Sequence, residues 1–172
     1  MNPDLDLLHP YPFEKLRTLF SDVTPNPTLE HITLGIGEPK HAAPQFVLDT
    51  LTNNLNRIGQ YPSTAGLPEL REAISEWLCR RFQLGSISID SVLPVNGTRE
   101  ALFAIAQAVV DRNEGGYVMF PNPFYQIYEG ACLLAGAEPL MVNCDSHSGL
   151  PDFSEITEAQ WQKTQLLYLC TP

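Results

Sequence analysis

Short apolar runs alternate with amphipathic stretches from Ile87 onwards, and this alternation restricts the fold more than any other feature of the chain. The expected strands cover 91–95, 117–120, 139–143 and 165–170, and the expected helices cover 98–110, 126–135 and 153–162. Strands that alternate with helices are typical of a mostly parallel sheet with helices on both faces. We therefore expect an α/β fold.

The first part of the chain is expected to form an arm followed by two surface helices. Residues 1–30 contain five prolines, which leave room for one short helix over 13–20. Further helices are expected over 44–55 and 67–82, with a polar loop between them. The spacing predicts that the second of these buries the following apolar side chains: Leu70, Ile74, Trp77, Leu78 and Phe82.

The stretch Leu93–Val110 is the best candidate for a binding site. Its apolar run breaks at Asn96-Gly97 and passes directly into a helix. A helix N-terminus presents unpaired backbone N–H groups and the positive end of the helix dipole, which together favour an anion such as phosphate. Thr98 and Arg99 could add a hydroxyl and a charge, and Glu100 could close a capping box. The alternative interpretation is a plain helix cap.

Three other residues lie in loops where a ligand could bind. Tyr125 follows an expected strand, and ligands of open α/β sheets sit beyond the carboxyl ends of the strands. Its ring could lie against a planar cofactor or simply cover the core. Gly37 lies in the glycine-bearing turn that is expected to end the extended segment over 32–39, and Tyr61 stands in the polar loop. A plain turn and an exposed loop tyrosine are the alternatives for these two.

Composition and charge narrow the range of partners. The 172 residues are 44% apolar and 17% charged, which suits a soluble globular domain with one sizeable core. The net charge of −10 disfavours nucleic acid and anionic membranes, because both repel an acidic protein. No apolar run approaches a membrane span, and the acidic N-terminus does not resemble a signal peptide. We expect a cytoplasmic protein that binds small molecules.

The sequence lacks several familiar catalytic and metal-binding patterns. Its four cysteines form no C-x-x-C pair and are expected to be buried thiols, and its four histidines have no metal-ligand spacing. It contains no G-x-G-x-x-G, no Walker lysine motif and no G-x-S-x-G. These absences disfavour the commonest dehydrogenases, NTPases and hydrolases, and no metal site is expected.

Five segments, in this order, resemble the N-terminal half of the fold-type-I aminotransferases of class I/II, which depend on pyridoxal 5′-phosphate (PLP). They are Leu34-Gly-Ile-Gly-Glu-Pro39, Tyr61-Pro-Ser-Thr-Ala-Gly-Leu-Pro-Glu-Leu-Arg-Glu-Ala-Ile74, Val95-Asn-Gly-Thr-Arg-Glu-Ala-Leu102, Pro121-Asn-Pro-Phe-Tyr-Gln-Ile-Tyr128 and Leu167-Tyr-Leu-Cys-Thr-Pro172. Within that family, three strings are most similar to the bacterial succinyldiaminopimelate aminotransferases: the arm at Leu8–Leu16, Gly37-Glu-Pro-Lys-His41 and Leu93-Pro-Val-Asn-Gly-Thr-Arg-Glu100. The resemblance implies residues 1–40 as an N-terminal arm and substrate-side segment, and 41–172 as the first half of the PLP-binding large domain.

The resemblance also implies roles for individual residues. Gly97, Thr98 and Arg99 would hold the cofactor phosphate, and Tyr125 would stack on the pyridine ring. Tyr61 would reach the phosphate bound by the other subunit of a homodimer, and Gly37 would lie beside the substrate carboxylate. The implied reaction is transamination in lysine and diaminopimelate biosynthesis, with glutamate as amino donor and N-succinyl-2-amino-6-oxopimelate as acceptor.

The family's catalytic residues have no counterparts in these 172 residues. The Schiff-base lysine and the arginine that binds the substrate carboxylate normally follow the position of Pro172, and Lys15, Lys40 and Lys163 do not fit the lysine's place. We therefore assign no catalytic residue and expect the second half in a separate, cleaved or missing chain. Two alternatives remain: a PLP-dependent carbon–sulfur lyase on the same scaffold, and a non-catalytic truncated fragment that only binds a ligand or dimerises.

Overall fold

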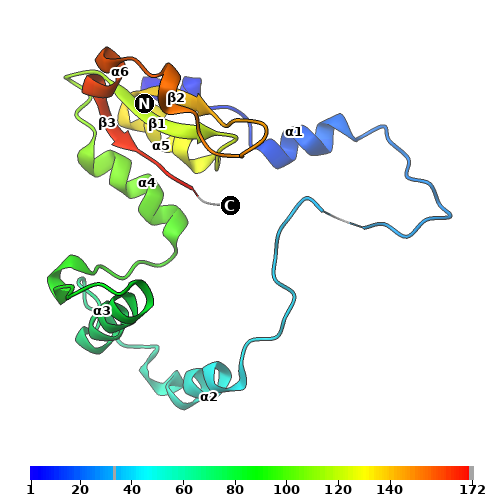
Figure 1. Ribbon diagram of the computed structural model, residues 1–172. Coiled ribbons are helices and arrows are strands. Elements are labelled where there is room, and N and C mark those ends of the chain that lie inside the picture. Colours follow the sequence, from blue (N-terminus) through cyan, green and yellow to red (C-terminus); the bar gives the residue numbers. More distant parts are fainter. Residues whose placement is uncertain (33, 171–172) are drawn as a thin grey trace. The chain divides into compact units, whose positions relative to one another are not determined.

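The computed structural model describes residues 1–32 and 34–170 (Figure 1). The chain divides into two compact units. One comprises Met1–Ser21 together with Val95–Pro172, and the other comprises Asp22–Pro94. The candidate phosphate turn and Tyr125 belong to the first unit, whereas Gly37 and Tyr61 belong to the second.

The first unit is built on a parallel sheet, as the alternating pattern predicts. Strands β1 (Tyr117–Asn122), β2 (Glu138–Asn143) and β3 (Thr164–Leu167) pair in the order β2-β1-β3. The central strand β1 is buried from Val118 to Pro121. A parallel strand covered on both faces requires such a continuous apolar run, which is why Tyr117-Val-Met-Phe is recognisable in the sequence.

Helices α4 (Thr98–Val109) and α5 (Ile127–Ala135) form the main core with one face of this sheet. The core contains Val118 and Phe120 from β1, and Ala131 and Cys132 from α5. Met119 points to the other face and is also fully buried. The connection from β2 to β3 contains η4 (Phe153–Glu155) and α6 (Glu158–Lys163), and right-handed crossovers place it on the face opposite α5. The expected α/β architecture is confirmed.

Helix boundaries in this unit follow local chemistry. Gly136 ends α5 in the left-handed conformation with φ of 83°, a common helix stop. A capping box between Thr157 and Gln160 begins α6. The single helix expected over 153–162 is therefore interrupted, because the cap at Thr157 starts a new helix after the η4 turn.

The arm packs against the sheet unit through polar contacts. It contains η1 (Pro3–Leu7) and α1 (Pro12–Leu19), each with proline in its first turn. Asp4 pairs with Arg112, and His9 lies 3.2 Å from the carboxylate of Glu129 on α5. These contacts attach the start of the chain to α5 and to the turn after α4.

The second unit consists of helices and loops among its described residues. It contains α2 (Gln45–Asn53), η2 (Leu55–Arg57), α3 (Pro68–Phe82) and η3 (Ile89–Ser91). The Arg71 guanidinium on α3 donates to the carbonyls of Ile89 and Val92, and the Ser75 hydroxyl donates to that of Ile87. Side-chain hydrogen bonds thus fix the η3 segment along one side of α3.

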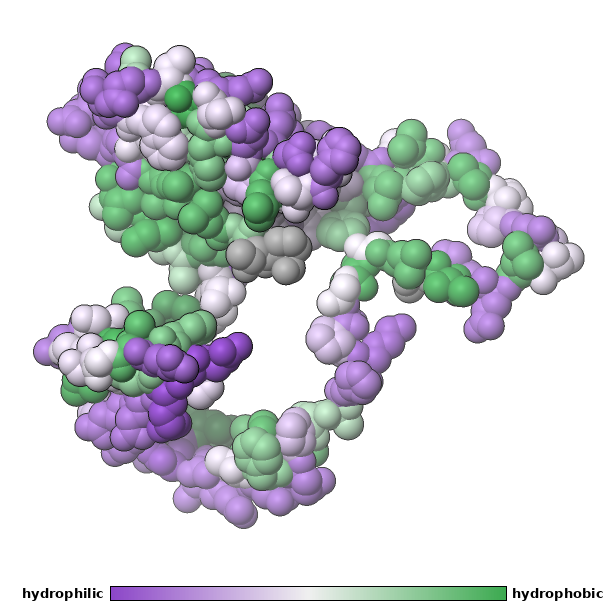
Figure 2. Space-filling view, in the orientation of Figure 1, coloured by the Kyte–Doolittle hydropathy of each residue, from purple (hydrophilic) through white to green (hydrophobic). Residues whose placement is uncertain are grey.

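One prediction about this part of the chain is partly wrong and another is wrong. Of the five α3 side chains expected to be buried, Ile74 and Leu78 are half-buried, whereas Leu70, Trp77 and Phe82 are exposed. The buried residue of α3 is Ser75, because hydrogen bonding to the 87–92 segment determines which side of the helix is covered. Residues 91–95 form no strand, and Pro94 explains this since it has no N–H for a ladder. Figure 2 shows apolar residues on the surface, and several of them lie in this unit.

The ends of the other predicted elements shift by a few residues. Strand β1 extends two residues further than expected, to Asn122, and β3 ends at Leu167 instead of 170. Thr33, in the extended segment expected over 32–39, lies outside the described residues, and the remaining residues of that segment form no strand. The division of the chain at residue 40 stays a prediction.

Candidate functional site

The turn at Gly97 leads into α4 without a side-chain cap. Gly97 is the N-cap residue, with φ of 106°, a value that favours glycine. Gly97 has no side chain that could accept a hydrogen bond from the first turn of this helix. The first N–H groups of a helix have no partners within it, so they remain available to an anion at this end of α4.

Thr98 and Arg99 stand exposed in the first turn of α4. The Arg99 guanidinium lies over the ring of Tyr11 in the arm, with its central carbon 6.0 Å from the ring centroid. A cation above an aromatic face is attracted to it. The arm therefore helps to place the charge beside the phosphate-binding turn, a relationship that sequence spacing does not reveal.

The capping box expected from Glu100 is not formed. The structure gives α4 no side-chain cap, although the Glu100 carboxylate lies close to Gly97: a Cβ built on the glycine would be 2.8 Å from its Oε2. A carboxylate beside the turn opposes a second anion by like-charge repulsion. An anion that binds here must be held by the backbone N–H groups, the Thr98 hydroxyl and Arg99.

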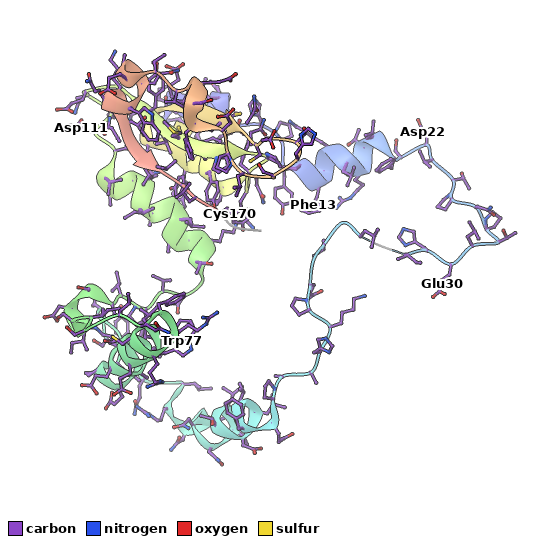
Figure 3. The ribbon with its side chains drawn as sticks, viewed as in Figure 1. Phe13, Asp22, Glu30, Trp77, Asp111 and Cys170 are labelled. Carbon is purple, nitrogen blue, oxygen red and sulfur yellow. The ribbon has the colours of Figure 1, made fainter. Side chains whose placement is uncertain are left out.

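Tyr125 lies just beyond the carboxyl end of β1, where the sequence places it. It follows the Asn122–Phe124 segment and precedes α5, and its side chain is 37% exposed. This is enough exposure for a ligand to contact the ring. Tyr168 and Cys170 follow β3, the neighbouring parallel strand, and Figure 3 shows Cys170 beyond the end of that strand. Thr171 and Pro172, expected at the same edge, lie outside the described residues.

The buried Tyr128 adjoins Tyr125, and a second buried tyrosine, Tyr168, adjoins Tyr128. Burial, and after it the neighbouring Cys170 thiol, raise the pKa of Tyr128 above its usual value. Burial raises the pKa of Tyr168 to about 12. Both phenols therefore stay protonated and uncharged at neutral pH. Sequence reasoning missed these residues, although the three-residue spacing between Tyr125 and Tyr128 at the start of a helix was an available signal.

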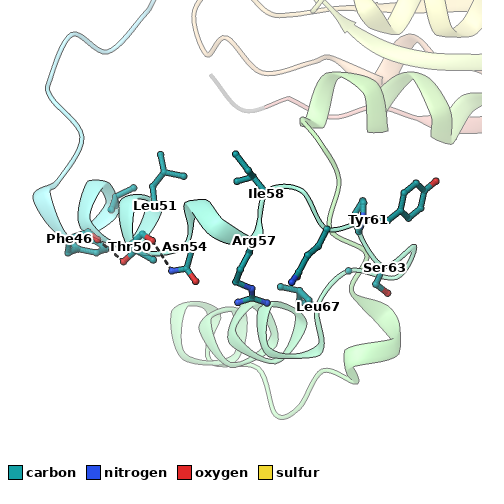
Figure 4. A pocket seen from close by; sticks show the side chains of 13 residues that line it. Phe46, Thr50, Leu51, Asn54, Arg57, Ile58, Tyr61, Ser63 and Leu67 are labelled. Atoms are coloured by element: carbon teal, nitrogen blue, oxygen red, sulfur yellow. Dashed lines mark hydrogen bonds between the residues drawn. The ribbon is translucent and has the colours of Figure 1, made fainter.

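Tyr61 and Gly37 belong to the second unit. Tyr61 is 97% exposed and lies at a groove of about 670 Å³ between α2 and the loop that carries it (Figure 4). Apolar side chains of α2 and of the following turn line much of this groove, among them Phe46, Leu51 and Ile58. Gly37 is exposed in a segment without regular structure, and a Cβ at this position would meet no atom within 4 Å.

The cysteines and lysines offer little to a reaction centre among the described residues. All four cysteines are free; Cys132 is buried, as expected, whereas Cys170 is exposed because β3 ends before it. Burial raises the pKa of Cys132 to about 12, so this thiol is unreactive at neutral pH. Lys163 stands at the amino end of β3, the opposite edge from Tyr125, and Lys15 lies on α1.

Metal clusters and membrane-spanning helices are both absent from the described residues. Residues 1–32 and 34–170 contain no group of three or more His, Cys, Asp or Glu side chains arranged to hold a metal ion. Within the same ranges, no helix is both long enough and apolar enough to cross a membrane.

Comparison with known proteins identifies the family. Residues 30–172 match the model of the class I and II aminotransferases, and the chain belongs to that family. It is similar to an aminotransferase from Neisseria meningitidis Z2491 of known crystal structure, with a TM-score of 0.92 and 44% identity; the match covers 100% of this chain and 44% of that one. It also resembles the aminotransferase AspB from Helicobacter pylori 26695, with a TM-score of 0.84 and 33% identity over 94% of this chain and 42% of that one.

A curated relative gives a more specific comparison. The LL-diaminopimelate aminotransferase of Desulforudis audaxviator is 30% identical over 168 residues, which are 96% of this chain and 42% of that protein. The chain thus spans less than half the length of the relatives it matches. Aminotransferases of this family depend on PLP. The uncapped start of α4 and the exposed ring of Tyr125 suit the phosphate and the planar ring of that cofactor.

Proposed function

We propose that the whole protein is a PLP-dependent aminotransferase and that this chain supplies the seat for the cofactor. The observation that carries the proposal is the first turn of α4, which begins at Gly97 with no side-chain cap in a chain of the aminotransferase family. PLP, when bound, acts as the electron sink for the reaction. In this proposal, the part of the chain that the structure describes binds the cofactor and orients it.

In this proposal each candidate site residue of the first unit has a separate task. The backbone of the Gly97 turn and the Thr98 hydroxyl donate hydrogen bonds to the phosphate, and Arg99 supplies a positive charge. Tyr125 places its ring against the pyridine ring. These tasks suit the positions of the residues, since the turn starts a helix and Tyr125 stands in the loop between β1 and α5.

Two of the proposed site residues, Tyr61 and Gly37, belong to the second unit. We propose a homodimer in which Tyr61 donates its hydroxyl to the phosphate bound by the other subunit, and in which Gly37 lies beside the substrate carboxylate. The exposure of Tyr61 supports a role outside its own unit. The open space around Gly37 leaves room for a substrate to approach the backbone. Four free cysteines suit a reducing compartment, and we propose the cytoplasm.

For the substrates, we propose glutamate as amino donor and N-succinyl-2-amino-6-oxopimelate as acceptor, within diaminopimelate and lysine biosynthesis. The relatives named as LL-diaminopimelate aminotransferases support a diaminopimelate-type compound. The arm sequence at Leu8–Leu16 supports the succinylated form. Small amino and keto acids are accordingly the proposed partners.

The test is an assay of the whole protein with PLP, glutamate and the succinylated keto acid, in which 2-oxoglutarate is measured. The proposal expects more than one equivalent of 2-oxoglutarate per active site to form only when the acceptor is present. A parallel assay with LL-diaminopimelate and 2-oxoglutarate distinguishes the succinylated from the unmodified substrate. Equal or faster reaction of the unmodified compound would refute the proposed acceptor and leave the aminotransferase proposal standing.

A second assay addresses the alternative activity on the same scaffold. A carbon–sulfur lyase would release pyruvate and ammonia from a thioether amino acid, with no keto-acid acceptor. Release of pyruvate without any transamination would refute the proposed function. If the whole protein bound PLP but catalysed neither reaction, a binding role would replace the enzymatic one.

A further inference from the structure

Three tyrosines form a continuous stack that leads from the core to the candidate site. The rings of Tyr168 and Tyr128 lie parallel, 4.4 Å apart with 10° between their planes. Tyr128 then meets Tyr125 edge to face, with centroids 5.9 Å apart and 84° between the planes. Both arrangements are among those that aromatic pairs prefer.

The inner end of the stack is anchored to helix α4. The Tyr168 hydroxyl donates a hydrogen bond to the backbone carbonyl of Leu102, which lies one turn into the helix that begins at Gly97. The stack therefore joins the carboxyl ends of β1 and β3 to the helix that carries the phosphate turn. Tyr128 and Tyr168 are only 4% and 5% exposed, whereas Tyr125 is 37% exposed.

We propose that Tyr128 and Tyr168 are positioning residues that fix the ring of Tyr125 relative to helix α4. The inference rests on the proposed function, in which α4 holds the phosphate and Tyr125 contacts the cofactor ring. The phosphate and the ring of PLP are joined by a short methylene ester, so the two seats must stay within a narrow range of separation. Tyr125 stands in the loop between β1 and α5, and the ring behind it is the buried Tyr128, which is stacked in turn on Tyr168.

The aromatic cluster around the two buried rings supports this role. Both buried phenols have a raised pKa, and Tyr128 contacts Phe120 of the core as well as its two tyrosine neighbours. Phe120 in turn contacts Phe124, in the loop that leads to Tyr125. The loop and the ring are thus held by the same buried aromatic cluster.

The first experiment measures the position of Tyr125 in the whole protein without PLP, by NMR of ring-labelled tyrosine. The Tyr128 ring should shift the Tyr125 ring signals through its ring current. Replacement Tyr128→Leu should move these signals toward the values of an unstructured tyrosine, whereas Tyr128→Phe should leave them nearly unchanged. Unchanged signals in Tyr128→Leu would overturn the proposal, whether or not the protein binds PLP.

The second experiment measures PLP affinity by equilibrium dialysis. Tyr128→Leu should weaken binding by about 2- to 12-fold, the range that corresponds to loss of one aromatic pair. In a Tyr125→Leu background the same replacement should cause no further loss, since there is no ring left to position. Equal losses in both backgrounds would show a merely structural effect and overturn the proposal.

Two further variants keep the test decisive. Tyr168→Phe retains the ring and removes only the bond to Leu102, so it should fold and should weaken PLP binding in the same direction by a smaller factor. If Tyr128→Leu does not fold, wild-type affinity in Tyr168→Phe would contradict the anchoring.

Phe153→Leu removes a ring from a different pair, with Trp161, and serves as the control without an effect on Tyr125. Failure of the wild-type protein to bind PLP would refute the proposed function, while the NMR result still decides the positioning.

Discussion

The Arg99 guanidinium lies over the ring of Tyr11, with its central carbon 6.0 Å from the ring centroid. This contact joins the N-terminal arm to the first turn of α4. Tyr11 is the N-cap residue of α1, so the position of its ring depends on how the arm packs. The arm is thereby connected to the residues proposed to bind phosphate.

Replacement Tyr11→Leu should weaken PLP binding by the whole protein. A cation–π contact at an exposed site contributes about 0.5–1 kcal/mol, which corresponds to roughly 2- to 5-fold in affinity. Phe13, a neighbour of Tyr11 in the arm, provides the matched control. Phe13→Leu also removes an aromatic ring from the arm, but the recorded partner of Arg99 is Tyr11. Equal losses in the two variants would contradict a specific role of the Arg99–Tyr11 contact.

Replacement Thr98→Ala should lower cofactor retention. A hydrogen bond to a charged group contributes about 1.5–3 kcal/mol, so we expect a loss of roughly 10- to 150-fold in PLP affinity. Thr98→Ser keeps the hydroxyl at an exposed position and should retain most of the affinity. Equilibrium dialysis of each apo-protein with PLP measures the affinities of both variants. An unchanged affinity in Thr98→Ala would count against the phosphate turn.

Two adjacent glycines before β1 allow a test of the close packing in the sheet unit. Gly116 has φ of 135°, and a Cβ there would clash with the backbone carbonyl of Lys163; Gly115 also has a positive φ, of 64°, but open space around it. Both alanine variants should lose about 1–2 kcal/mol through backbone strain. Gly116→Ala should lose about 1–3 kcal/mol more, because the backbone at Lys163 must move. Urea unfolding measures the difference, and equal losses would show that the two segments separate easily.

The sequence predicts those features that depend on local chemistry or on the period of apolar residues. Helix α4, the stop at Gly136 and the apolar strand β1 are of this kind, and so is the turn at Gly97. The burial of Ser75 could not be predicted in the same way, because it depends on a hydrogen bond to the carbonyl of Ile87, far along the chain. The stack behind Tyr125 likewise requires β3 to lie beside β1, which a single sequence does not specify.

Stability should fall at alkaline pH because of Tyr168. Its pKa is about 12 in the folded protein, against 10.0 for an unperturbed tyrosine. Below about pH 10 the phenol is protonated in both the folded and unfolded states, so its contribution is constant. Between about pH 10 and 12 the unfolded chain loses the proton first, and stability is lost as pH rises toward the folded pKa.

Replacement Tyr168→Phe should make this decline in the free energy of unfolding shallower, since the group that titrates is gone. Urea unfolding of the wild type and the variant across the alkaline range provides the comparison. A decline of the same steepness in both proteins would contradict the burial of the phenol.

The most direct test of the central claim is a crystal structure of the whole protein with PLP bound. The account predicts that the phosphate lies at the start of α4, within hydrogen-bond distance of the backbone N–H groups after Gly97 and of the Thr98 hydroxyl, with the Tyr125 ring against the pyridine ring. A phosphate bound elsewhere, with the start of α4 left in solvent, would contradict it.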